Sequence, residues 1–170
     1  MKFQTLQTND VAAMWRINEQ GLPGVGKVSE EKLADLLSLA TLPLGAFEGD
    51  ALVGFVLCLL PGTRYASPNY GWFNARYEQF LYVDRVAVST AHRDRQVGTK
   101  LYERVIAHAE GHTWPIAAEV SLDPPNPGSM RFHQRHGFKE VGKLHHEKQV
   151  VTMLIREANT QSRSAHLCQK

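Results

Sequence analysis

The sequence contains few cysteines and no hydrophobic run long enough for a membrane helix. Its 170 residues include two cysteines, Cys58 in an apolar run and Cys168 in a polar segment, so no disulfide framework is expected. The apolar run at residues 52–60 has the length of a strand, whereas a membrane helix needs about 20 apolar residues. The N-terminus has the alternation of a strand and lacks the apolar core of a signal peptide. These absences predict a reduced, cytoplasmic protein without a membrane partner.

An excess of charge of one sign is also missing. The formal net charge is +2, and the lysines and arginines are scattered, so we expect no nucleic-acid partner. The sequence has no G-x-S-x-G, Walker or C-x-x-C motif, which argues against the enzymes that depend on them. His145, His146 and Glu147 are adjacent, but neighbouring strand residues point to opposite faces, so no metal site is expected there.

The remaining composition is that of one compact domain. Hydrophobic residues make up 43% of the chain and charged residues 21%, as in ordinary globular proteins. We expect one domain over residues 1–156 and a polar, aperiodic and poorly ordered tail over 157–170. Alternating or apolar runs predict strands at residues 3–6, 42–48, 51–60, 81–88, 116–122, 139–144 and 149–155. Helical spacing and capping residues predict helices after Asp10, after Ser29, after Gly98 and over 127–136.

The stretch at residues 80–110 combines a strand, a basic loop and a helix. The loop contains Arg93 and Arg95 and ends at Gly98, after which apolar residues recur at helical spacing. The N-terminus of a helix presents free N–H groups and a positive dipole end, so this arrangement predicts a binding site for an anion such as a phosphate.

Aromatic residues are concentrated in the polar segment at residues 63–79. This segment is a long connection between two predicted strands, and such connections often form lids or binding loops. A segment that only packs over the edge of the sheet would use the same residue types. The sequence leaves both interpretations open for Tyr70, Trp72 and Tyr77.

Motifs between residues 86 and 138 resemble the GNAT superfamily of N-acetyltransferases. They are R-V-A-V at 85–88, R-D-R-Q-V-G at 93–98, Asn126, Ser129 and F-H-Q-R-H-G-F at 132–138. The resemblance implies an α/β (α+β) fold of three αβα layers, whose mostly antiparallel twisted sheet contains a splayed parallel strand pair at the cofactor site. It further implies transfer of the acetyl group of acetyl-CoA to a small-molecule or peptide amine, by direct attack in a ternary complex. A CoA-binding regulatory module without turnover is the alternative.

The resemblance also implies residues for acetyl-CoA (coenzyme A). These are Val86, Ala87, Val88, Arg93, Arg95, Gln96, Val97, Gly98, Thr99, Asn126, Ser129 and His133. The sequence departs from the family pattern at Gln96, where a glycine is usual. Gln96 adds bulk and disfavours a positive φ at a turn where backbone N–H groups must approach a pyrophosphate. Gly98 supplies close approach and unusual dihedral angles.

Candidates for proton transfer come from three elements. His133 replaces the tyrosine with which the family often protonates the departing thiolate; a role in hydrogen bonding or packing is equally open. Glu119, charged within an apolar strand, and Asp84 are the favoured bases, although Asp84 and Arg85 also fit an exposed surface pair.

The acceptor side is predicted more broadly. We expect Tyr82 to form a wall of the acceptor site, which the aromatic segment lines or covers. The residues predicted to contact the acceptor are Tyr82, Tyr70, Trp72, Tyr77 and Glu19. Exposed aromatic residues around Trp72 would also suit a homodimer contact.

Overall fold

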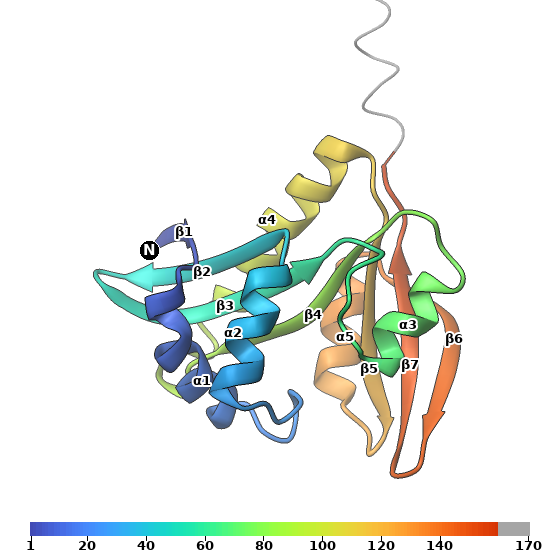
Figure 1. Cartoon of the computed structure of the whole chain (residues 1–170), viewed down its shortest axis with the longest axis horizontal. Coiled ribbons are helices and arrows are strands. Elements are labelled where there is room, and N and C mark those ends of the chain that lie inside the picture. The colour runs from blue at the N-terminus through green and yellow to red at the C-terminus, as the bar shows by residue number, and fades with distance from the viewer. Residues whose placement is uncertain (160–170) are drawn as a thin grey trace, which may run out of the picture.

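The computed structural model describes residues 1–159 and contains one mixed sheet with helices on both faces (Figure 1). The strands are β1 (Lys2–Thr5), β2 (Leu42–Glu48), β3 (Ala51–Leu59), β4 (Leu81–Val88), β5 (Ile116–Asp123), β6 (Lys139–His146) and β7 (Gln149–Arg156). The helices are α1 (Val11–Gln20), α2 (Glu30–Leu39), α3 (Pro68–Asn74), α4 (Val97–His112) and α5 (Pro127–Arg135), with short 3-10 turns η1 (Thr8–Asp10) and η2 (Thr90–His92). Residues 160–170 of the predicted tail lie outside the described part of the chain.

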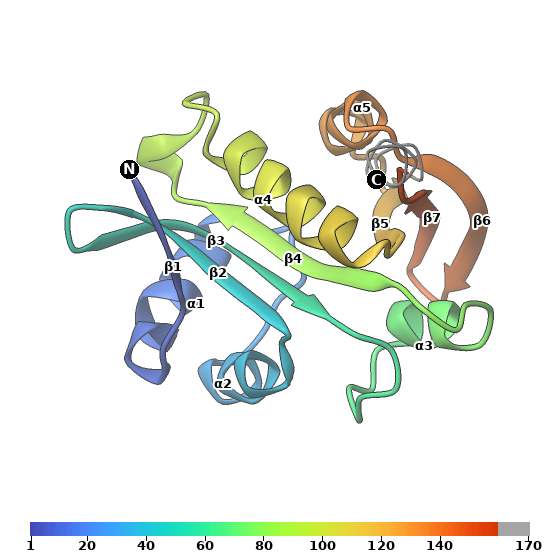
Figure 2. The same ribbon diagram turned by 90° about the horizontal axis from the view of Figure 1, so that it is seen from above.

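The seven strands follow the order β1-β2-β3-β4-β5-β7-β6. Strands β4 and β5 are parallel and are connected by α4, whereas the other neighbouring strands are antiparallel. Figure 2 shows α1, α2 and α3 on one face of the twisted sheet and α4 and α5 on the other. The predicted three-layer α/β fold is therefore confirmed.

Each face of the sheet has its own hydrophobic core. Side chains from α1 and α2, such as Met14 and Leu33, pack with Phe55 and Leu57 on the first face. The stripe of α4 packs on the opposite face; its buried members are Val97, Leu101, Tyr102, Val105 and Ala109. The central strands are therefore packed against a hydrophobic core on both faces of the sheet.

The parallel strands separate soon after they meet. Their pairing consists of Leu81 with Ile116 and Tyr82 with Ala117, although both strands continue for several residues. Pairing with β3 shifts at this point, because Leu57 pairs with Arg85 but Cys58 with Val83, which leaves Asp84 as the extra residue of a bulge. The splay that the resemblance implies is present, and the bulge at Asp84 lies where it begins.

Local signals explain why most helix boundaries were predictable. The Ser29 hydroxyl accepts a hydrogen bond from the Lys32 amide at 3.1 Å, and the Asn126 side chain accepts one from the Ser129 amide at 3.2 Å. Pro127 occupies the first turn of α5, where its missing N–H is harmless.

Helix α3 is the element that the sequence did not predict. It lies within the aromatic segment and packs across the end of the sheet. A Cβ added to Gly142 of β6 would lie 2.6 Å from Cζ2 of Trp72, so the indole ring sits directly on this glycine. The Arg76 guanidinium covers the ring at 4.0 Å from its centroid. Trp72 is therefore half-buried, which corrects the expectation of an exposed aromatic contact; the homodimer stays a prediction.

Within residues 1–159, no helix is long and apolar enough to cross a bilayer.

Candidate active site

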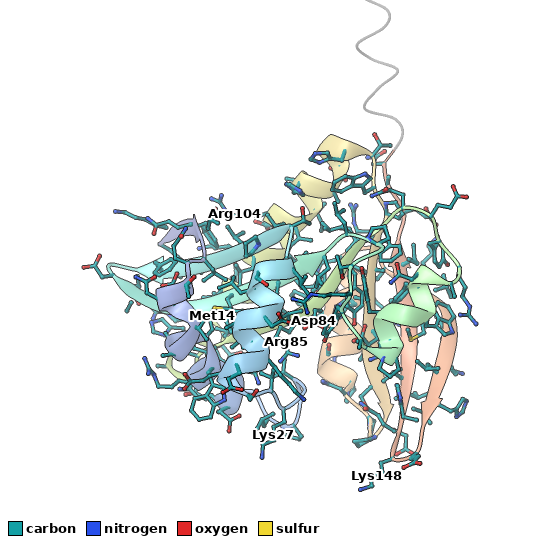
Figure 3. All side chains as sticks on the ribbon, viewed as in Figure 1. Met14, Lys27, Asp84, Arg85, Arg104 and Lys148 are labelled. Carbon is teal, nitrogen blue, oxygen red and sulfur yellow. The ribbon has the colours of Figure 1, made fainter. Side chains whose placement is uncertain are left out.

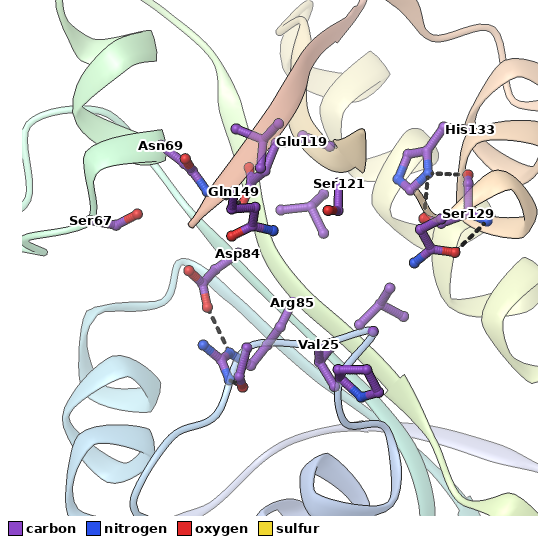
Figure 4. Close-up of a pocket in the computed structure, with 18 of the residues that line it drawn as sticks. Val25, Ser67, Asn69, Asp84, Arg85, Glu119, Ser121, Ser129, His133 and Gln149 are labelled. Atoms are coloured by element: carbon purple, nitrogen blue, oxygen red, sulfur yellow. Dashed lines mark hydrogen bonds and ion pairs between the residues drawn. The ribbon is translucent and has the colours of Figure 1, made fainter. Parts of the chain in front are cut away.

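A cavity of about 870 Å³ opens where β4 and β5 separate (Figure 4). Its walls come from the α1–α2 loop, the segment before α3, strands β4, β5 and β7, and helices α4 and α5. The polar and ionisable lining side chains are Lys27, Tyr65, Ser67, Asn69, Asp84, Arg85, Tyr102, Glu119, Ser121, Asn126, Ser129, His133 and Gln149. The splay thus brings together residues that the sequence assigned separately to cofactor and catalysis.

Glu119 projects from β5 into this cavity. Its Oε1 accepts a hydrogen bond from the Tyr82 hydroxyl at 2.8 Å and another from Nδ2 of Asn69 at 3.1 Å. Its Oε2 is buried and has no hydrogen-bond partner. A buried carboxylate oxygen without a donor is costly, and such atoms are commonly kept for a ligand or a proton.

The environment of Glu119 opposes its ionisation. Burial, together with the negative charge of Asp84, raises the pKa of this carboxyl from its usual range to about 8. The hydrogen bonds from Tyr82 and Asn69 and the charge of Arg85 act in the opposite direction and limit the rise. A carboxyl with a pKa near neutrality can accept and release a proton during turnover.

Asp84 and Arg85 form a buried ion pair beside the bulge in β4 (Figures 3 and 4). Arg85 Nε lies 2.8 Å from Asp84 Oδ2, and their side chains are 9% and 4% exposed, so the alternative of an exposed surface pair is wrong. The pair also holds two loops, because the Tyr65 hydroxyl donates to Asp84 Oδ1 at 2.6 Å, and Arg85 Nη1 donates to Asn18 and to the Gly26 carbonyl. These contacts show that the ion pair holds the segments that form the cavity walls in place.

His133 is buried at the other end of the cavity. Its Nδ1 lies 2.8 Å from the Ser129 carbonyl oxygen, and its Nε2 lies 2.7 Å from the Tyr102 hydroxyl. Since a carbonyl only accepts, the neutral ring carries its proton on Nδ1, and Nε2 accepts from Tyr102. Burial lowers the pKa of His133 and favours this neutral form.

Tyr102 is a functional candidate that sequence reasoning missed. Its position in the apolar stripe of α4 marked it as a core residue, and it is almost completely buried. The hydroxyl nevertheless reaches the cavity lining and the His133 ring. Tyr102 and His133 are 31 positions apart in the sequence, so no local pattern indicates that they are in contact.

The N-terminus of α4 fits the predicted anion site. Gln96 precedes the helix in the left-handed conformation, with φ of 61°, and no side chain caps the helix. The first N–H groups, including those of Val97, Gly98 and Thr99, have no acceptor within the helix. They are thus available to a pyrophosphate, so the residues present fit the phosphate end of acetyl-CoA.

Gly98 serves this turn differently from the expectation. The positive φ angles fall on Asp94 and Gln96, whereas Gly98 is helical, so the expectation of unusual dihedral angles at Gly98 is wrong. The nearest atom to a Cβ built there is Val88 Cγ2 at 3.9 Å. The absence of a side chain at Gly98 therefore leaves room for a ligand beside the helix, although the backbone conformation there does not require glycine.

The two loop arginines are exposed and contact other parts of the protein. Arg93 Nη2 donates to the Gln20 carbonyl at 2.8 Å, and Arg95 lies 3.9 Å from Glu48. These contacts brace the loop against α1 and the β2–β3 hairpin.

The predicted cofactor residues occupy two places. Val86, Asn126, Ser129 and His133 line the cavity. Ala87 and Val88 follow along β4, and Arg93 to Thr99 form the turn and first helical residues beyond it.

Three residues that were predicted to contact the acceptor have structural positions: Tyr82 holds Glu119, and Tyr70 and Tyr77 belong to the hydrophobic core or pack against it. Tyr82 is buried and supports Glu119. Tyr70 is a core residue whose hydroxyl bonds the Leu60 carbonyl and Thr63, and Tyr77 packs against the same core.

Two other residues that were predicted to contact the acceptor do not line the cavity. Trp72 lies on β6, and Glu19 has a buried Oε1 without a partner but is not among the described residues that line the cavity. The aromatic segment reaches the lining through Tyr65, Ser67 and Asn69.

No group of three or more His, Cys, Asp or Glu side chains suited to a metal ion occurs within the described residues.

Comparison with known proteins agrees with this arrangement. The sequence profile of the acetyltransferase (GNAT) family matches residues 12–138. The ribosomal-protein-S18-alanine N-acetyltransferase of Escherichia coli has 14% identity and a TM-score of 0.74, with 94% of each chain covered. NAA60 of Arabidopsis thaliana, solved with a bisubstrate analogue, has 16% identity and a TM-score of 0.73, with 93% of this chain and 98% of that chain covered.

A third structure, yncA of Salmonella typhimurium, was solved with its cofactor acetyl-CoA. It has 16% identity and a TM-score of 0.68, with 94% of each chain covered. The TM-scores of 0.68 to 0.74 show that these three proteins share the fold of this chain. The sequence has no match among curated proteins.

The match to the family model defines the general class of protein, an acetyltransferase that uses acetyl-CoA. The chain belongs to the acetyltransferase (GNAT) family.

Proposed function

We propose that the protein is an N-acetyltransferase that transfers the acetyl group of acetyl-CoA to a small-molecule or peptide amine. The observation that carries this proposal is the buried Oε2 of Glu119, an atom that has no hydrogen-bond partner and belongs to a residue that lines the cavity at the splay of β4 and β5. Family membership supports the acetyl donor, and the carboxylate supports an acceptor that must lose a proton before it attacks.

The cofactor would lie along β4, with its phosphates at the start of α4. The β4 backbone beyond Tyr82 has no partner strand on the β5 side, which suits pairing with an extended arm. The uncapped N–H groups at Val97 and Gly98 suit the pyrophosphate, and Asn126 and Ser129 flank the opposite wall. When bound, acetyl-CoA supplies an activated thioester.

Glu119 is the general base in this proposal. The ammonium group of the acceptor gives a proton to Oε2, and the amine attacks the acyl carbon directly within a ternary complex. The new C–N bond forms as the C–S bond breaks, and a backbone N–H of β4 near Val86 stabilises the oxyanion. Asp84 does not act as a second base here, because Tyr65 and Arg85 already occupy its oxygens.

The departing thiolate takes a proton from the Tyr102 hydroxyl, which lines the cavity. Nε2 of His133 accepts from this hydroxyl at 2.7 Å and orients it. This assignment modifies the sequence hypothesis, in which His133 acted alone.

Acetyl transfer is tested by following thiol release from acetyl-CoA with a panel of amines, peptides and free amino acids. Glu119→Gln keeps the shape of the side chain but removes the base, so turnover should fall by about 10²- to 10⁴-fold, the usual contribution of a general base, with little change in the binding of acetyl-CoA. Equal turnover of Glu119→Gln and the unaltered protein would overturn the role of Glu119.

The alternative, a CoA-binding module without turnover, makes a different prediction. Acetyl-CoA would raise the melting temperature, but no amine in the panel would release thiol. Failure of acetyl-CoA to stabilise the protein at all would overturn both functions.

A further inference from the structure

The hydrogen bonds around Glu119 continue to the far edge of the sheet. Asn69, near the start of α3, donates from Nδ2 to Glu119 Oε1 at 3.1 Å, and its Oδ1 lies 2.9 Å from Nε2 of His146 at the end of β6. Asn69 is 50 positions from Glu119 and 77 from His146, so three separate elements meet in this chain of contacts.

The contacts determine which way the Asn69 amide faces. An amide has an acceptor on one side and donors on the other, whereas a carboxylate only accepts. Nδ2 donates to Glu119, so Oδ1 turns toward His146, and the Nε2 atom of His146 beside it is the one that carries the proton. The reverse orientation would place Oδ1 against Oε1 and lose both hydrogen bonds.

The orientation of Asn69 in turn determines which oxygen of Glu119 is free. Asn69 and Tyr82 both donate to Oε1, whereas Oε2 receives no hydrogen bond. Two donors from different elements prevent rotation of the carboxylate. The more basic lone pairs are therefore kept on Oε2, the oxygen that receives no hydrogen bond.

We propose that Asn69, oriented by His146, is a positioning residue that holds Glu119 with Oε2 toward the acceptor amine. This inference rests on the proposed function, in which Glu119 is the base. Neither residue touches the acceptor in this proposal; both act through the carboxylate.

Other titratable groups lie on the elements around the same carboxyl, so a test must separate them. They are Tyr65, Tyr82, Asp84, Arg85, Tyr102, His133, His146 and Lys27. Asp84 opposes ionisation of Glu119, whereas Tyr82, Asn69 and Arg85 favour it. Removal of Asn69 must therefore raise the pKa of Glu119, and removal of the Asp84 charge must lower it.

The test is the pH profile of kcat/KM for one acceptor, compared between Asn69→Ala and the unaltered protein. The base works only when ionised, so activity rises with pH through its pKa. Loss of a hydrogen bond to a charged group is worth about 1.4 kcal/mol or more, a tenfold effect, so kcat/KM at pH 7 should fall about tenfold and recover above pH 9. A loss that is equal at every pH would indicate a merely structural role and overturn the inference.

Matched variants test the contribution of His146. His146→Gln keeps an N–H donor and should retain most activity, whereas His146→Ala should reproduce the shift of Asn69→Ala. His145→Ala is the control, because this neighbouring side chain is exposed on the other face of β6. Equal effects of the His145 and His146 alanine variants would overturn the role of His146.

A second measurement does not depend on turnover. Infrared titration of the carboxyl band that Glu119→Gln removes reports ionisation of Glu119 directly. Asn69→Asp, which has nearly the shape of asparagine, should move that titration to higher pH, and an unmoved titration would overturn the inference. If the titration moves but no amine is acetylated, the proposed function fails and the positioning of Glu119 stands.

Discussion

The hydroxyl of Tyr102 lies 2.7 Å from Nε2 of His133, although the two residues belong to different helices. The other ring nitrogen faces the Ser129 carbonyl, so both nitrogens of His133 are engaged. A ring held in this way cannot turn to follow a substrate. The one proton in this contact is that of the Tyr102 hydroxyl, so in the proposed reaction Tyr102 gives the proton to the thiolate and His133 orients the hydroxyl.

Substitution of Tyr102 is the direct test of this pair. Tyr102→Phe leaves Nε2 of His133 buried without a donor, and we expect thiol release to slow by about 10²-fold, the lower range of general acid catalysis. The dissociation constant of acetyl-CoA should change little. His133→Phe should have the same effect, since it removes the same contact.

The double variant provides the control for this prediction. If the two residues act as one unit, the combined substitution should slow thiol release about as much as either single one. Independent, multiplying losses in the double variant would show that they do not form a pair.

Glu119 should make the stability of the protein depend on pH. The pKa of Glu119 is about 8 in the folded protein, whereas its ordinary value, which applies to the unfolded chain, is 4.5. The unfolded chain therefore releases this proton at lower pH than the folded protein. The resulting contribution to the free energy of unfolding is complete below pH 4.5 and is lost as the pH rises through 8. Glu119→Gln removes the titration, so its melting temperature should exceed that of the unaltered protein by several degrees at pH 9.

Thermal unfolding from pH 5 to pH 9 measures this difference. The gap between the two proteins should widen from pH 5 to about pH 8 and then level off, and a constant gap would contradict the prediction. Glu48→Gln is a suitable comparison, because the pKa of that exposed carboxyl is lowered by its hydrogen bond to His92. Its contribution changes only below pH 4.5, so the gap for this variant should stay constant from pH 5 to pH 9.

The turn before α4 contains avoidable backbone strain. Gln96 has a φ of 61°, a conformation that costs a residue with a side chain about 1 kcal/mol compared with glycine. Gln96→Gly should therefore raise the free energy of unfolding by about 1 kcal/mol, as measured by urea denaturation. Gln96→Ala keeps the strain and is the control; an equal gain from alanine would show that the dihedral angle is not the cause.

The contact between Trp72 and Gly142 should link the position of α3 to activity. A side chain at Gly142 would meet Cζ2 of Trp72 at 2.6 Å, so Gly142→Ala must displace the helix that carries Asn69. We expect a destabilisation of about 1 to 3 kcal/mol, as for overpacking in a core, together with reduced turnover at pH 7.

Gly111→Ala is the matched control for this glycine substitution. A Cβ at Gly111 would meet no atom within 4 Å, and the residue lies within α4, so alanine should leave activity unchanged and stabilise by up to about 1 kcal/mol. Similar losses at Gly111 and Gly142 would contradict the role of the Trp72 contact.

Sequence reasoning predicted the fold well where the signals are local. The cap at Ser29, the Asn126–Pro127 start of α5 and the alternation of the strands each act within a few residues. Helix α3 was missed because it is one short element among aromatic residues whose packing on Gly142 is invisible in the sequence.

The site was predictable in part for the same reason. Motifs indicated His133 and the turn at Gly98, and a charged residue in an apolar strand indicated Glu119. The burial of the Asp84–Arg85 pair depends on Tyr65, from the segment before α3, and on Asn18 of α1, both distant in the sequence. Asn69 and Tyr102 likewise gain their contacts only through tertiary structure.

The short pairing of β4 and β5 has a mechanical consequence. Two residue pairs join a half of four strands to a half of three, and each half has continuous antiparallel pairing of its own. The seam between them is the weakest line across the sheet, and Asp84 and Glu119 lie on opposite sides of it. A ligand that bridges the seam therefore ties the two halves together, and slower amide exchange along β4 and β5 would record that reinforcement.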